Sequence, residues 1–341
     1  MSADKSGKIG VGVVGYGQIG EHYHAALSAS VDGFFLAAVC DAVDARLEAA
    51  RERFGCPTYK SYEDFLADDD ISLVAIGTPP NMHCDQALAA IAVGKNVLCD
   101  KPFAMNYEQA KKMVNAARDA GVLITANQNR RFDSDYLTVK KAIADGLLGE
   151  VYDRGSRWSH FTEIWTSYGV KEFNSTWRIQ RAFGGGMVYD YCSHLGDQML
   201  RMVASPLVSV YADLQSRIWS KEVDDHFHAE LRFADKTVAT VEATNNWRTP
   251  LPRWFVTGTK GTLISQPVGG CDVHVFTDDG EQVLEPVTAP ATVIYDNLAD
   301  VLLRGAEPLV KPEHALDAMR LISMIFDSAE TGEVVHAQDY Q

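Results

Sequence analysis

The chain has 341 residues, enough for about two domains of roughly 150 residues each, and 46% of them are hydrophobic and 23% charged. This composition is that of an ordinary globular protein. The formal net charge of −15 disfavours nonspecific nucleic-acid binding, because neutralising phosphates needs a basic surface.

The sequence also argues against a membrane or secreted protein. It has no cluster of Lys and Arg, no apolar stretch long enough to span a bilayer, and a polar N-terminus without a hydrophobic signal segment. Its six cysteines are scattered without a CxxC pair, so neither a disulfide framework nor a zinc site is predicted. We therefore expect a cytoplasmic protein that binds neither nucleic acid nor membrane.

A glycine-rich turn follows the first apolar run. Residues 9–14 are predicted to form a strand, Gly15-Tyr16-Gly17-Gln18-Ile19-Gly20 follows directly, and residues 21–29 are predicted to form a helix. In this context a GxGxxG motif predicts dinucleotide binding, with the diphosphate at the helix N-terminus. The first glycine permits the tight turn, the second lets the backbone approach the pyrophosphate, and the third allows close helix–strand packing. A glycine turn without a ligand is the weaker alternative.

A second apolar run, residues 34–40, ends on Asp41, about twenty residues after the glycines. An acid at this place accepts hydrogen bonds from the adenosine ribose and repels a 2′-phosphate, so Asp41 predicts NAD rather than NADP. Arg46, on the predicted helix 43–54, could reach back to the same place, so the use of NADP stays open. Asp41 could also cap that helix, and the two roles are compatible.

Strands and helices continue to alternate up to about residue 126. Further strands are predicted at 72–76, 96–99 and 122–126, and helices at 82–93 and 107–120. Repeated βα units with apolar strands indicate a doubly wound parallel sheet with helices on both faces, and ligands of such sheets bind beyond the carboxyl ends of the strands. The polar segments at those ends are Thr78-Pro79, Asp100-Lys101 and Asn127-Gln128-Asn129-Arg130. For Lys101 this position favours a functional role over that of a solvent-exposed lysine.

Beyond about residue 130 the pattern changes to longer alternating strands. They are predicted at 151–161, 208–218, 226–233, 237–244, 254–257, 271–276 and 282–284, with a turn at Asp278-Asp279-Gly280. We expect a large, mostly antiparallel open sheet with one helix on its face, and C-terminal helices at 292–304 and 312–330 that pack back near the first domain. The fold class is thus α/β, with a Rossmann domain at 1–129 followed by an α+β domain at 130–341.

The helix expected on that sheet carries the candidate reactive groups. Gly184-Gly185-Gly186 leads into a segment in which Asp190 and His194 stand at i and i+4 on one helix face, with Asp197 one turn further on. A carboxylate beside an imidazole makes a proton acceptor, because the acid raises the pKa of the base and orients it. A solvated helix face with a local ion pair is the alternative. The dinucleotide-binding half favours the proton acceptor, because it supplies a cofactor for such a base.

Two other histidines share a face of one predicted strand. His226 and His228 alternate along it, with Asp224 nearby. They could bind a metal, but alternating polar residues at a sheet edge or interface are commoner, so no metal is predicted.

These motifs resemble those of the family of glucose-fructose oxidoreductase, inositol dehydrogenase and MocA-type proteins (Gfo/Idh/MocA), along almost the whole chain. The family's Glu-Lys-Pro signature appears as Asp100-Lys101-Pro102, and its glycine-led Asp-x-x-x-His-x-x-Asp motif as Asp190, His194 and Asp197. The segments 129–133, 223–227 and 253–261 resemble the scyllo-inositol dehydrogenase-like branch.

The resemblance implies site residues. The catalytic set would be Lys101, Asp190 and His194. The dinucleotide would be lined by Gly15, Tyr16, Gly17, Gln18, Ile19, Gly20, Asp41, Thr78, Pro79, Asn81, His83, Lys101 and Asn129. The substrate would contact Trp158, Trp177, Arg178, Asp190 and His194. Trp177 could instead be a core aromatic, whereas an arginine is hard to bury without a partner, which favours a site role for Arg178.

Together these features predict an NAD-dependent dehydrogenase of a polyol or sugar, with NADP possible as cofactor. His194, supported by Asp190, would remove a hydroxyl proton, and Lys101 would stabilise the oxygen while a hydride passes to the nicotinamide. Two alternatives stay open. One is a redox-neutral sugar-processing enzyme, a glycosidase or eliminase, that keeps NAD bound; the other is an NAD-sensing regulator, which the complete lysine, aspartate and histidine set disfavours. The family also implies a homodimer or homotetramer formed through the open sheet face.

Overall fold

The protein is described by a computed structural model that covers residues 7–162, 176–267 and 269–340. These residues fall into two compact units. Unit 1 takes residues 7–127, 176–177 and 291–316, and unit 2 takes residues 128–162, 178–267, 269–290 and 317–340. A segment from the C-terminal part of the sequence thus belongs to the same unit as the N-terminal strands.

Unit 1 is built on a six-stranded sheet with the order β3-β2-β1-β4-β5-β6, in which every neighbouring pair is parallel. Its strands are β1 Ile9–Val14, β2 Phe34–Cys40, β3 Thr58–Tyr59, β4 Leu73–Ile76, β5 Asn96–Cys99 and β6 Ile124–Ala126. From β1 the chain adds β2 and β3 on one side, and then β4, β5 and β6 on the other side of β1. In such sheets ligands bind at this switch point, between β1 and β4. The predicted doubly wound Rossmann sheet is confirmed.

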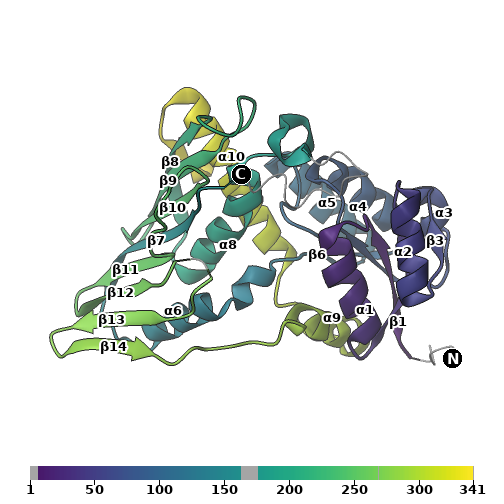
Figure 1. Cartoon of the computed structure of the whole chain (residues 1–341), viewed down its shortest axis with the longest axis horizontal. Coiled ribbons are helices and arrows are strands. Elements are labelled where there is room, and N and C mark those ends of the chain that lie inside the picture. The colour runs from purple at the N-terminus through teal and green to yellow at the C-terminus, as the bar shows by residue number, and fades with distance from the viewer. Residues whose placement is uncertain (1–6, 163–175, 268, 341) are drawn as a thin grey trace. The chain divides into compact units, whose positions relative to one another are not determined.

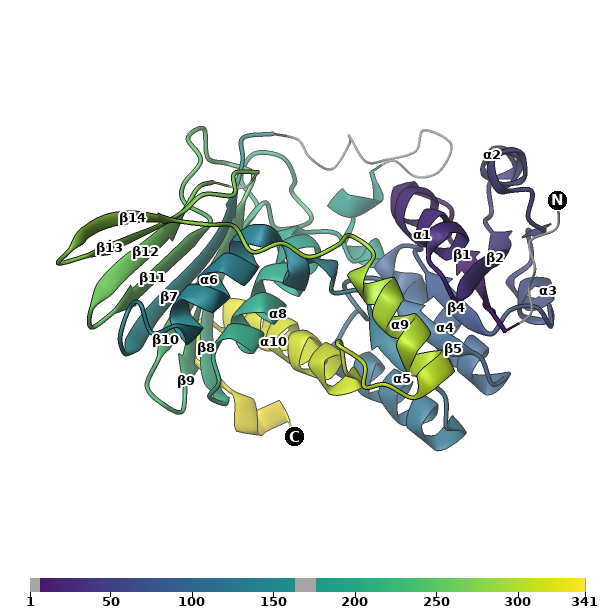
Figure 2. The same ribbon diagram turned by 90° about the horizontal axis from the view of Figure 1, so that it is seen from below.

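Helices cover both faces of this sheet (Figure 2). They are α1 Ala26–Ser30, which continues the π-helical turn Gly20–Ala25, α2 Asp44–Phe54, α3 Tyr62–Leu66, α4 His83–Ala92, α5 Tyr107–Ala120 and α9 Val293–Arg304. α9 packs beside the π-helical turn Gly20–Ala25 and the loop before β2: the Tyr295 hydroxyl lies 2.8 Å from Nδ1 of His24, and a Cβ on Gly33 would lie 3.0 Å from Leu303.

The ends of α5 show why its limits could be predicted from sequence. The Asn106 side chain accepts the backbone N–H of Gln109 at 2.9 Å, which satisfies one of the unpaired amides of the first turn. At the other end Gly121 takes a left-handed conformation, with φ of 68°, which ends the helix without steric cost. The cap and the glycine stand next to the helix in the sequence, so both limits are local signals.

Unit 2 is built on a nine-stranded sheet with the order β14-β13-β12-β11-β7-β10-β9-β8-β15 (Figure 1). Its strands are β7 Val151–Ser159, β8 Leu207–Gln215, β9 His226–Phe233, β10 Val238–Thr244, β11 Trp254–Gly258, β12 Gly261–Ser265, β13 Val273–Thr277, β14 Gly280–Leu284 and β15 Val335–His336. β7 and β10 run parallel and the other neighbouring pairs run antiparallel. The mostly antiparallel open sheet is therefore confirmed.

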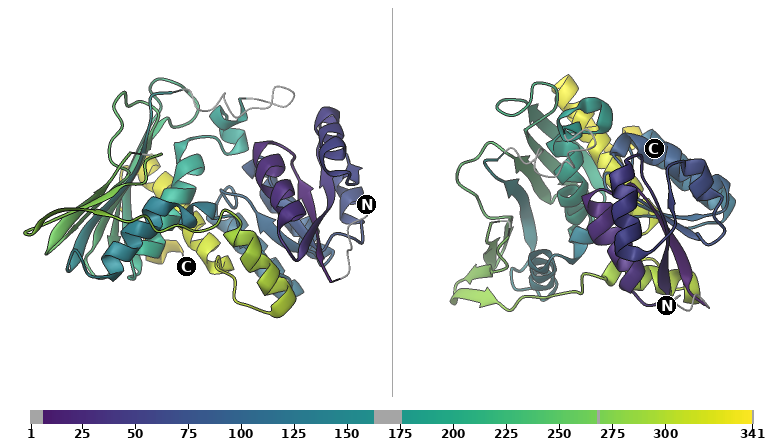
Figure 3. Two further views of the ribbon diagram at one scale, coloured as in Figure 1. Left: turned by 60° about the horizontal axis from the view of Figure 1, so that its bottom comes forward. Right: turned by 45° about the vertical axis from the view of Figure 1, so that its right-hand side comes forward.

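One face of this sheet packs against helices (Figure 3). They are α6 Ser134–Ala144, α8 Ser193–Met202 and the part of α10 Pro312–Thr331 that lies in unit 2. Strand alternation turns Phe227, Ala229 and Leu231 of β9 inward, where each is fully buried. Among the described helices, none has both the length and the apolar character needed to cross a membrane.

Three elements of unit 2 were not predicted from the sequence: α6, β12 and the two-residue strand β15. The strand predicted at 254–257 corresponds to β11, and β12, which only Thr259 and Lys260 separate from it, was not predicted. α6 was not predicted either, although its buried residues Tyr136, Val139 and Ala142 stand three positions apart, a spacing typical of a helix.

Candidate functional site

The three glycines of the turn after β1 are required for different reasons. Gly15 has φ of +86°, and a Cβ there would lie 2.7 Å from the backbone N of Thr78. A Cβ on Gly20 would lie 1.9 Å from the carbonyl oxygen of Gly15, so only glycine lets the helix begin this close to the turn. A Cβ on Gly17 would meet no heavy atom within 4 Å. Packing within the protein does not require glycine at 17, and the open space fits a dinucleotide whose diphosphate approaches the backbone.

Asp41 fixes the same turn from the end of β2. Its Oδ2 accepts the N–H of Tyr16 at 2.7 Å, its Oδ1 accepts the N–H of Val43 at 2.9 Å, and Nη1 of Arg46 lies 3.3 Å from Oδ2. A carboxylate has about four acceptor sites, so it keeps capacity for a ribose hydroxyl. The residues of this turn thus fit the adenosine end of a dinucleotide. Gln18 is exposed, Ile19 is half-buried, and the Tyr16 ring is buried.

Lys101 follows β5 and is half-buried, beside a network of polar groups inside unit 1. Asp100 Oδ1 accepts a hydrogen bond from Nδ2 of Asn127 at 2.8 Å and lies 3.5 Å from Nε2 of His24, whose Nδ1 faces the Tyr295 hydroxyl. Burial acts to raise the pKa of Asp100, but hydrogen bonding to His24 and Asn127 outweighs it and holds the pKa below its ordinary value. The Asp100 carboxylate before Lys101 is therefore held by side chains from two other segments of the sequence, those of His24 and Asn127.

His83 joins the loops that follow β4 and β5. Its Nδ1 lies 2.9 Å from the carbonyl oxygen of Pro102, and its Nε2 lies 2.9 Å from that of Thr78. The imidazole is fully buried, and this burial lowers its pKa. His83 thus holds the backbone of both loops. Of the other residues predicted after β4, Thr78 and Pro79 are half-buried and Asn81 is exposed.

Asp190 and His194 lie on one continuous helix of unit 2, which begins as the π-helical turn Val188–Cys192 and continues as α8. Asp190 is half-buried, and Nε of Arg178 lies 3.7 Å from its Oδ2. His194 is 7% exposed. The structure thus brings Arg178 and Asp190 together, and His194 lies four positions further along the same helix.

Asp197, one turn further on, has a different environment. It is 1% exposed, and its two carboxylate oxygens accept hydrogen bonds from Nε and Nη2 of Arg131 at 2.7 and 2.6 Å. Such a two-point ion pair has a fixed geometry. Asp197 therefore anchors α8 to the 3-10 turn Asn129–Phe132, which also contains the predicted Asn129.

Trp158 connects the loop after β6 with this helix. Its ring centroid lies 5.0 Å from that of Tyr191, the neighbour of Asp190, and the Arg130 guanidinium lies 4.5 Å from the Trp158 ring. Trp158 is buried, so it supports the surrounding side chains. His160 lies on the same strand end, and burial lowers its pKa. The remaining predicted residue, Trp177, begins the 3-10 turn Trp177–Ile179 and is half-buried.

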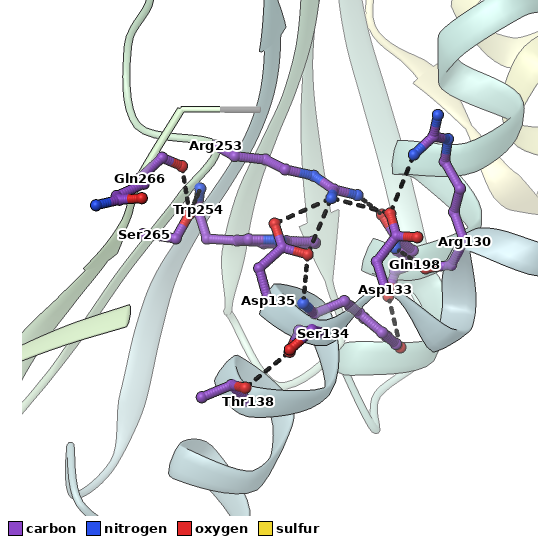
Figure 4. Close-up of polar contacts among 11 residues, drawn as sticks. Arg130, Asp133, Ser134, Asp135, Thr138, Gln198, Arg253, Trp254, Ser265 and Gln266 are labelled. Atoms are coloured by element: carbon purple, nitrogen blue, oxygen red, sulfur yellow. Dashed lines mark hydrogen bonds and ion pairs between the residues drawn. The ribbon is translucent and has the colours of Figure 1, made fainter. Parts of the chain in front are cut away.

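A polar cluster that sequence reasoning missed joins Arg253 to Asp133, Asp135 and Gln198 (Figure 4), and the Arg253 guanidinium lies 5.4 Å from the Trp158 ring. Nη1 of Arg253 lies 2.9 Å from oxygens of both Asp133 and Asp135, and its Nη2 lies 3.1 Å from Oε1 of Gln198. Burial raises the pKa of Asp135, and the Arg253 charge opposes this effect. The partners stand 55 to 120 positions apart in the sequence, so no local pattern could have paired them.

The histidines considered for a metal site have other neighbours. Nδ1 of His228 lies 3.7 Å from Oε1 of Glu242, and the His226 ring lies 6.3 Å from that of Trp247. Within residues 7–162, 176–267 and 269–340, no group of three or more His, Cys, Asp or Glu side chains is arranged to hold a metal ion.

Comparison with known proteins agrees with this architecture. Residues 9–128 match the oxidoreductase family with an NAD-binding Rossmann fold, GFO_IDH_MocA, and residues 136–264 match the C-terminal domain of the same family. The chain belongs to the Gfo/Idh/MocA oxidoreductase family. Its dinucleotide-binding domain is thus an NAD-binding domain.

Three relatives illustrate the similarity. A solved NAD-binding protein from Listeria innocua is 33% identical, with a TM-score of 0.85 over 96% of this chain and 97% of that one. The uncharacterized oxidoreductase YdgJ of Escherichia coli is 29% identical over 95% of this chain and 97% of its own. The NADP⁺-dependent scyllo-inositol 2-dehydrogenase IolW of Bacillus subtilis is 25% identical over 94% of both chains.

Proposed function

We propose that the protein is an NAD-dependent dehydrogenase that oxidises a CH–OH group of a polyol or sugar, with Lys101, Asp190 and His194 as its catalytic residues. The observation that carries this proposal is the placement of Asp190 and His194 on one helix in an NAD-binding oxidoreductase. The named activity of the Bacillus subtilis relative, which acts on scyllo-inositol, supports a polyol as the substrate class.

Each residue has a role that its chemistry suits. The imidazole of His194 takes the proton of the substrate hydroxyl, and Asp190 orients that imidazole and stabilises its charged form. The ammonium of Lys101 stabilises negative charge that develops on the substrate oxygen. Bound NAD supplies the hydride acceptor. Gly17, Asp41 and Thr78 line the dinucleotide with the other residues predicted for it.

The test is a His194→Ala variant compared with His336→Ala, an exposed histidine of β15 in the same unit. Loss of a general base is expected to lower kcat by about 10²–10⁴-fold, with the Kd for NADH unchanged. Lys101→Ala is expected to lower kcat in the same way, and the double variant to lose less than the product of the two losses, because the residues act on one step. Near-normal turnover of His194→Ala that still binds NADH would refute the assignment.

The substrate and cofactor are to be found with a panel of inositols and aldoses, each assayed with NAD and NADP by the absorbance of the reduced cofactor. Because of Asp41 we expect kcat/KM to be higher with NAD. Sugar release without net NADH formation would instead support the redox-neutral enzyme.

We also propose that the protein forms a homodimer or homotetramer through the sheet face opposite α6 and α8, and that it functions in the cytoplasm. The exposed side chains of Tyr211 and Phe276 on this sheet support such an interface. All six cysteines are free, and five of them are buried, which fits a reducing compartment. Sedimentation equilibrium measures the oligomeric state, and a monomer at micromolar concentration would contradict the interface.

A further inference from the structure

The helix that carries Asp190 and His194 is capped by a carboxylate from another part of the sequence. Oδ2 of Asp224, two residues before β9, accepts the backbone N–H of Val188 at 2.8 Å. The carbonyl oxygen of Asp224 accepts the N–H of Met187 at 3.1 Å. The first amides of a helix have no partner within it, so both contacts satisfy groups that would otherwise be unpaired.

The glycines before the helix make room for this contact. Gly186 has φ of +114°, and a Cβ there would lie 2.3 Å from Oδ1 of Asp224. A Cβ on Gly185 would lie 2.3 Å from the carbonyl oxygen of Arg178, which itself accepts the N–H of Gly186 at 3.0 Å. The glycine run therefore lets the Asp224 carboxylate approach on one side and the Arg178 backbone on the other.

The helix has no cap of its own at this end. Its N-cap residue is Met187, whose side chain makes no capping hydrogen bond. α5 differs, because Asn106, directly before it, caps Gln109. Asp224, 36 positions after Val188, thus supplies the acceptor that the local sequence lacks.

We propose that Asp224 is a positioning residue for the reaction: by holding Val188, it fixes the first helical turn and thereby the place of the Asp190 carboxylate. Asp190 follows Val188 by two residues, and its own N–H is bonded to the carbonyl oxygen of Gly186 at 3.0 Å, so a shift of that turn moves it directly. His194 lies one turn deeper and moves less. The inference rests on the proposed catalytic role of Asp190 and His194.

The experiment compares Asp224→Ala, which removes the acceptor, with Asp224→Asn, whose amide oxygen can still accept the Val188 N–H. We expect Asp224→Ala to lower kcat about 10–100-fold, with the Kd for NADH within about 3-fold of the parent, because the dinucleotide-binding residues are untouched. Asp224→Asn is expected to restore kcat to within about 3-fold. The matched control is Asn106→Ala, which removes the cap of α5, a helix without proposed site residues, and is expected to leave kcat unchanged.

Hydrogen exchange of the amides at 187–192 gives a readout that does not depend on turnover. Exchange there is expected to accelerate in Asp224→Ala, but not in Asp224→Asn or Asn106→Ala. Unchanged exchange or unchanged kcat in Asp224→Ala overturns the inference, and so does an equal loss of kcat in Asp224→Asn. If Asp224→Ala does not fold, Asp224→Asn decides alone: parental kcat and exchange support the cap, and a loss of either overturns it. None of these outcomes changes the His194→Ala result, so the two proposals fail separately.

Discussion

Both units hold a glycine-rich segment with a distant aspartate, but the two carboxylates have different surroundings. In unit 1, Asp41 accepts the N–H of Tyr16 at 2.7 Å and has Arg46 at 3.3 Å. In unit 2, Asp224 accepts the N–H of Val188 at 2.8 Å, and within the described residues no arginine or lysine forms an ion pair with it. Burial raises the pKa of Asp224 to about 7. A carboxylate beside an arginine suits a polar ligand, whereas one enclosed by backbone amides suits a structural cap.

The largest effect is expected further along the helix that Asp224 caps. Arg131→Ala would leave the Asp197 carboxylate buried without its partner, so the free energy of unfolding should fall by about 3–5 kcal/mol. Urea unfolding measures this loss. If the stability of the unit 2 helix depends on distant partners, the loss of unfolding free energy in Arg131→Ala should exceed the loss in any glycine variant of the turn in unit 1.

The control for this change is an exposed ion pair. Lys141 and Asp145 pair on the surface of α6, and Lys141→Ala should cost no more than about 0.5 kcal/mol. Similar losses of unfolding free energy in Lys141→Ala and Arg131→Ala would show that the buried ion pair stabilises the protein no more than the exposed one.

The next largest effect separates the glycines of the turn in unit 1. Gly20→Ala puts a Cβ 1.9 Å from the Gly15 carbonyl oxygen and should lower the free energy of unfolding by about 3 kcal/mol. Gly17→Ala meets no protein atom, so stability should change by less than about 0.5 kcal/mol. If a diphosphate approaches Gly17, the same variant should weaken NADH binding at least about tenfold, by fluorescence titration. Unaltered NADH binding would place the dinucleotide away from Gly17.

Local signals account for what could be predicted of the fold. The strand, turn and helix around Gly15 and the cap and stop of α5 all lie within a few residues of the element they define. α6 was missed although Asp133 and Ser134 at its start are typical helix N-cap residues, because the alternation of strands and helices was predicted to end at about residue 130.

For the candidate site too, residues that belong to local sequence patterns could be predicted, and residues with distant partners could not. Asp41 was predicted as a site residue because its distance from the glycines belongs to a motif, and Asp190 and His194 were predicted because helical spacing relates them. Asp224 and Arg131 were not assigned roles, because their partners are 36 and 66 positions away and only the fold brings them together. The sequence therefore points to candidate ligand-binding groups more readily than to the groups that hold them in place.

A smaller effect concerns how the free energy of unfolding depends on pH, and it is expected for Asp224 in unit 2. The folded pKa of Asp224 is about 7, above its ordinary value of 3.8, so the folded state binds this proton more readily than the unfolded chain. Its stabilising contribution is therefore full below 3.8 and is lost as pH rises to about 7. Asp224→Asn should remove this loss and reduce the fall in unfolding free energy between pH 5 and pH 8 by about 2 kcal/mol.

The pKa values of the titratable groups around Asp224 are shifted away from the pH range in which Asp224 titrates. The pKa of Tyr189 is raised to about 12 and that of Cys192 is also raised, both mainly by burial. Burial acts to raise the pKa of Asp225, but hydrogen bonds from Asn246 and neighbouring backbone amides outweigh it, so its pKa is lowered. Thermal unfolding of both proteins across pH 5–8 measures the difference, and parallel curves would mean that Asp224 does not titrate there.

An effect on stability smaller than that of Asp224 is expected at the other aspartate, Asp41, and it sharpens the contrast in ligand access. Arg46→Ala removes the arginine partner of Asp41 and should lower the free energy of unfolding by about 1 kcal/mol, because the buried carboxylate keeps the hydrogen bonds from the N–H groups of Tyr16 and Val43. This guanidinium offsets the repulsion between Asp41 and a 2′-phosphate, so in its absence NADPH binding should weaken at least about tenfold while NADH binding stays within about threefold. Fluorescence titration with both cofactors measures this, with Arg51→Ala, an exposed arginine of the same helix, as the control. Equal losses for NADH and NADPH would mean that Arg46 contacts a part common to both cofactors, and the carboxylate alone would then set the preference for NAD.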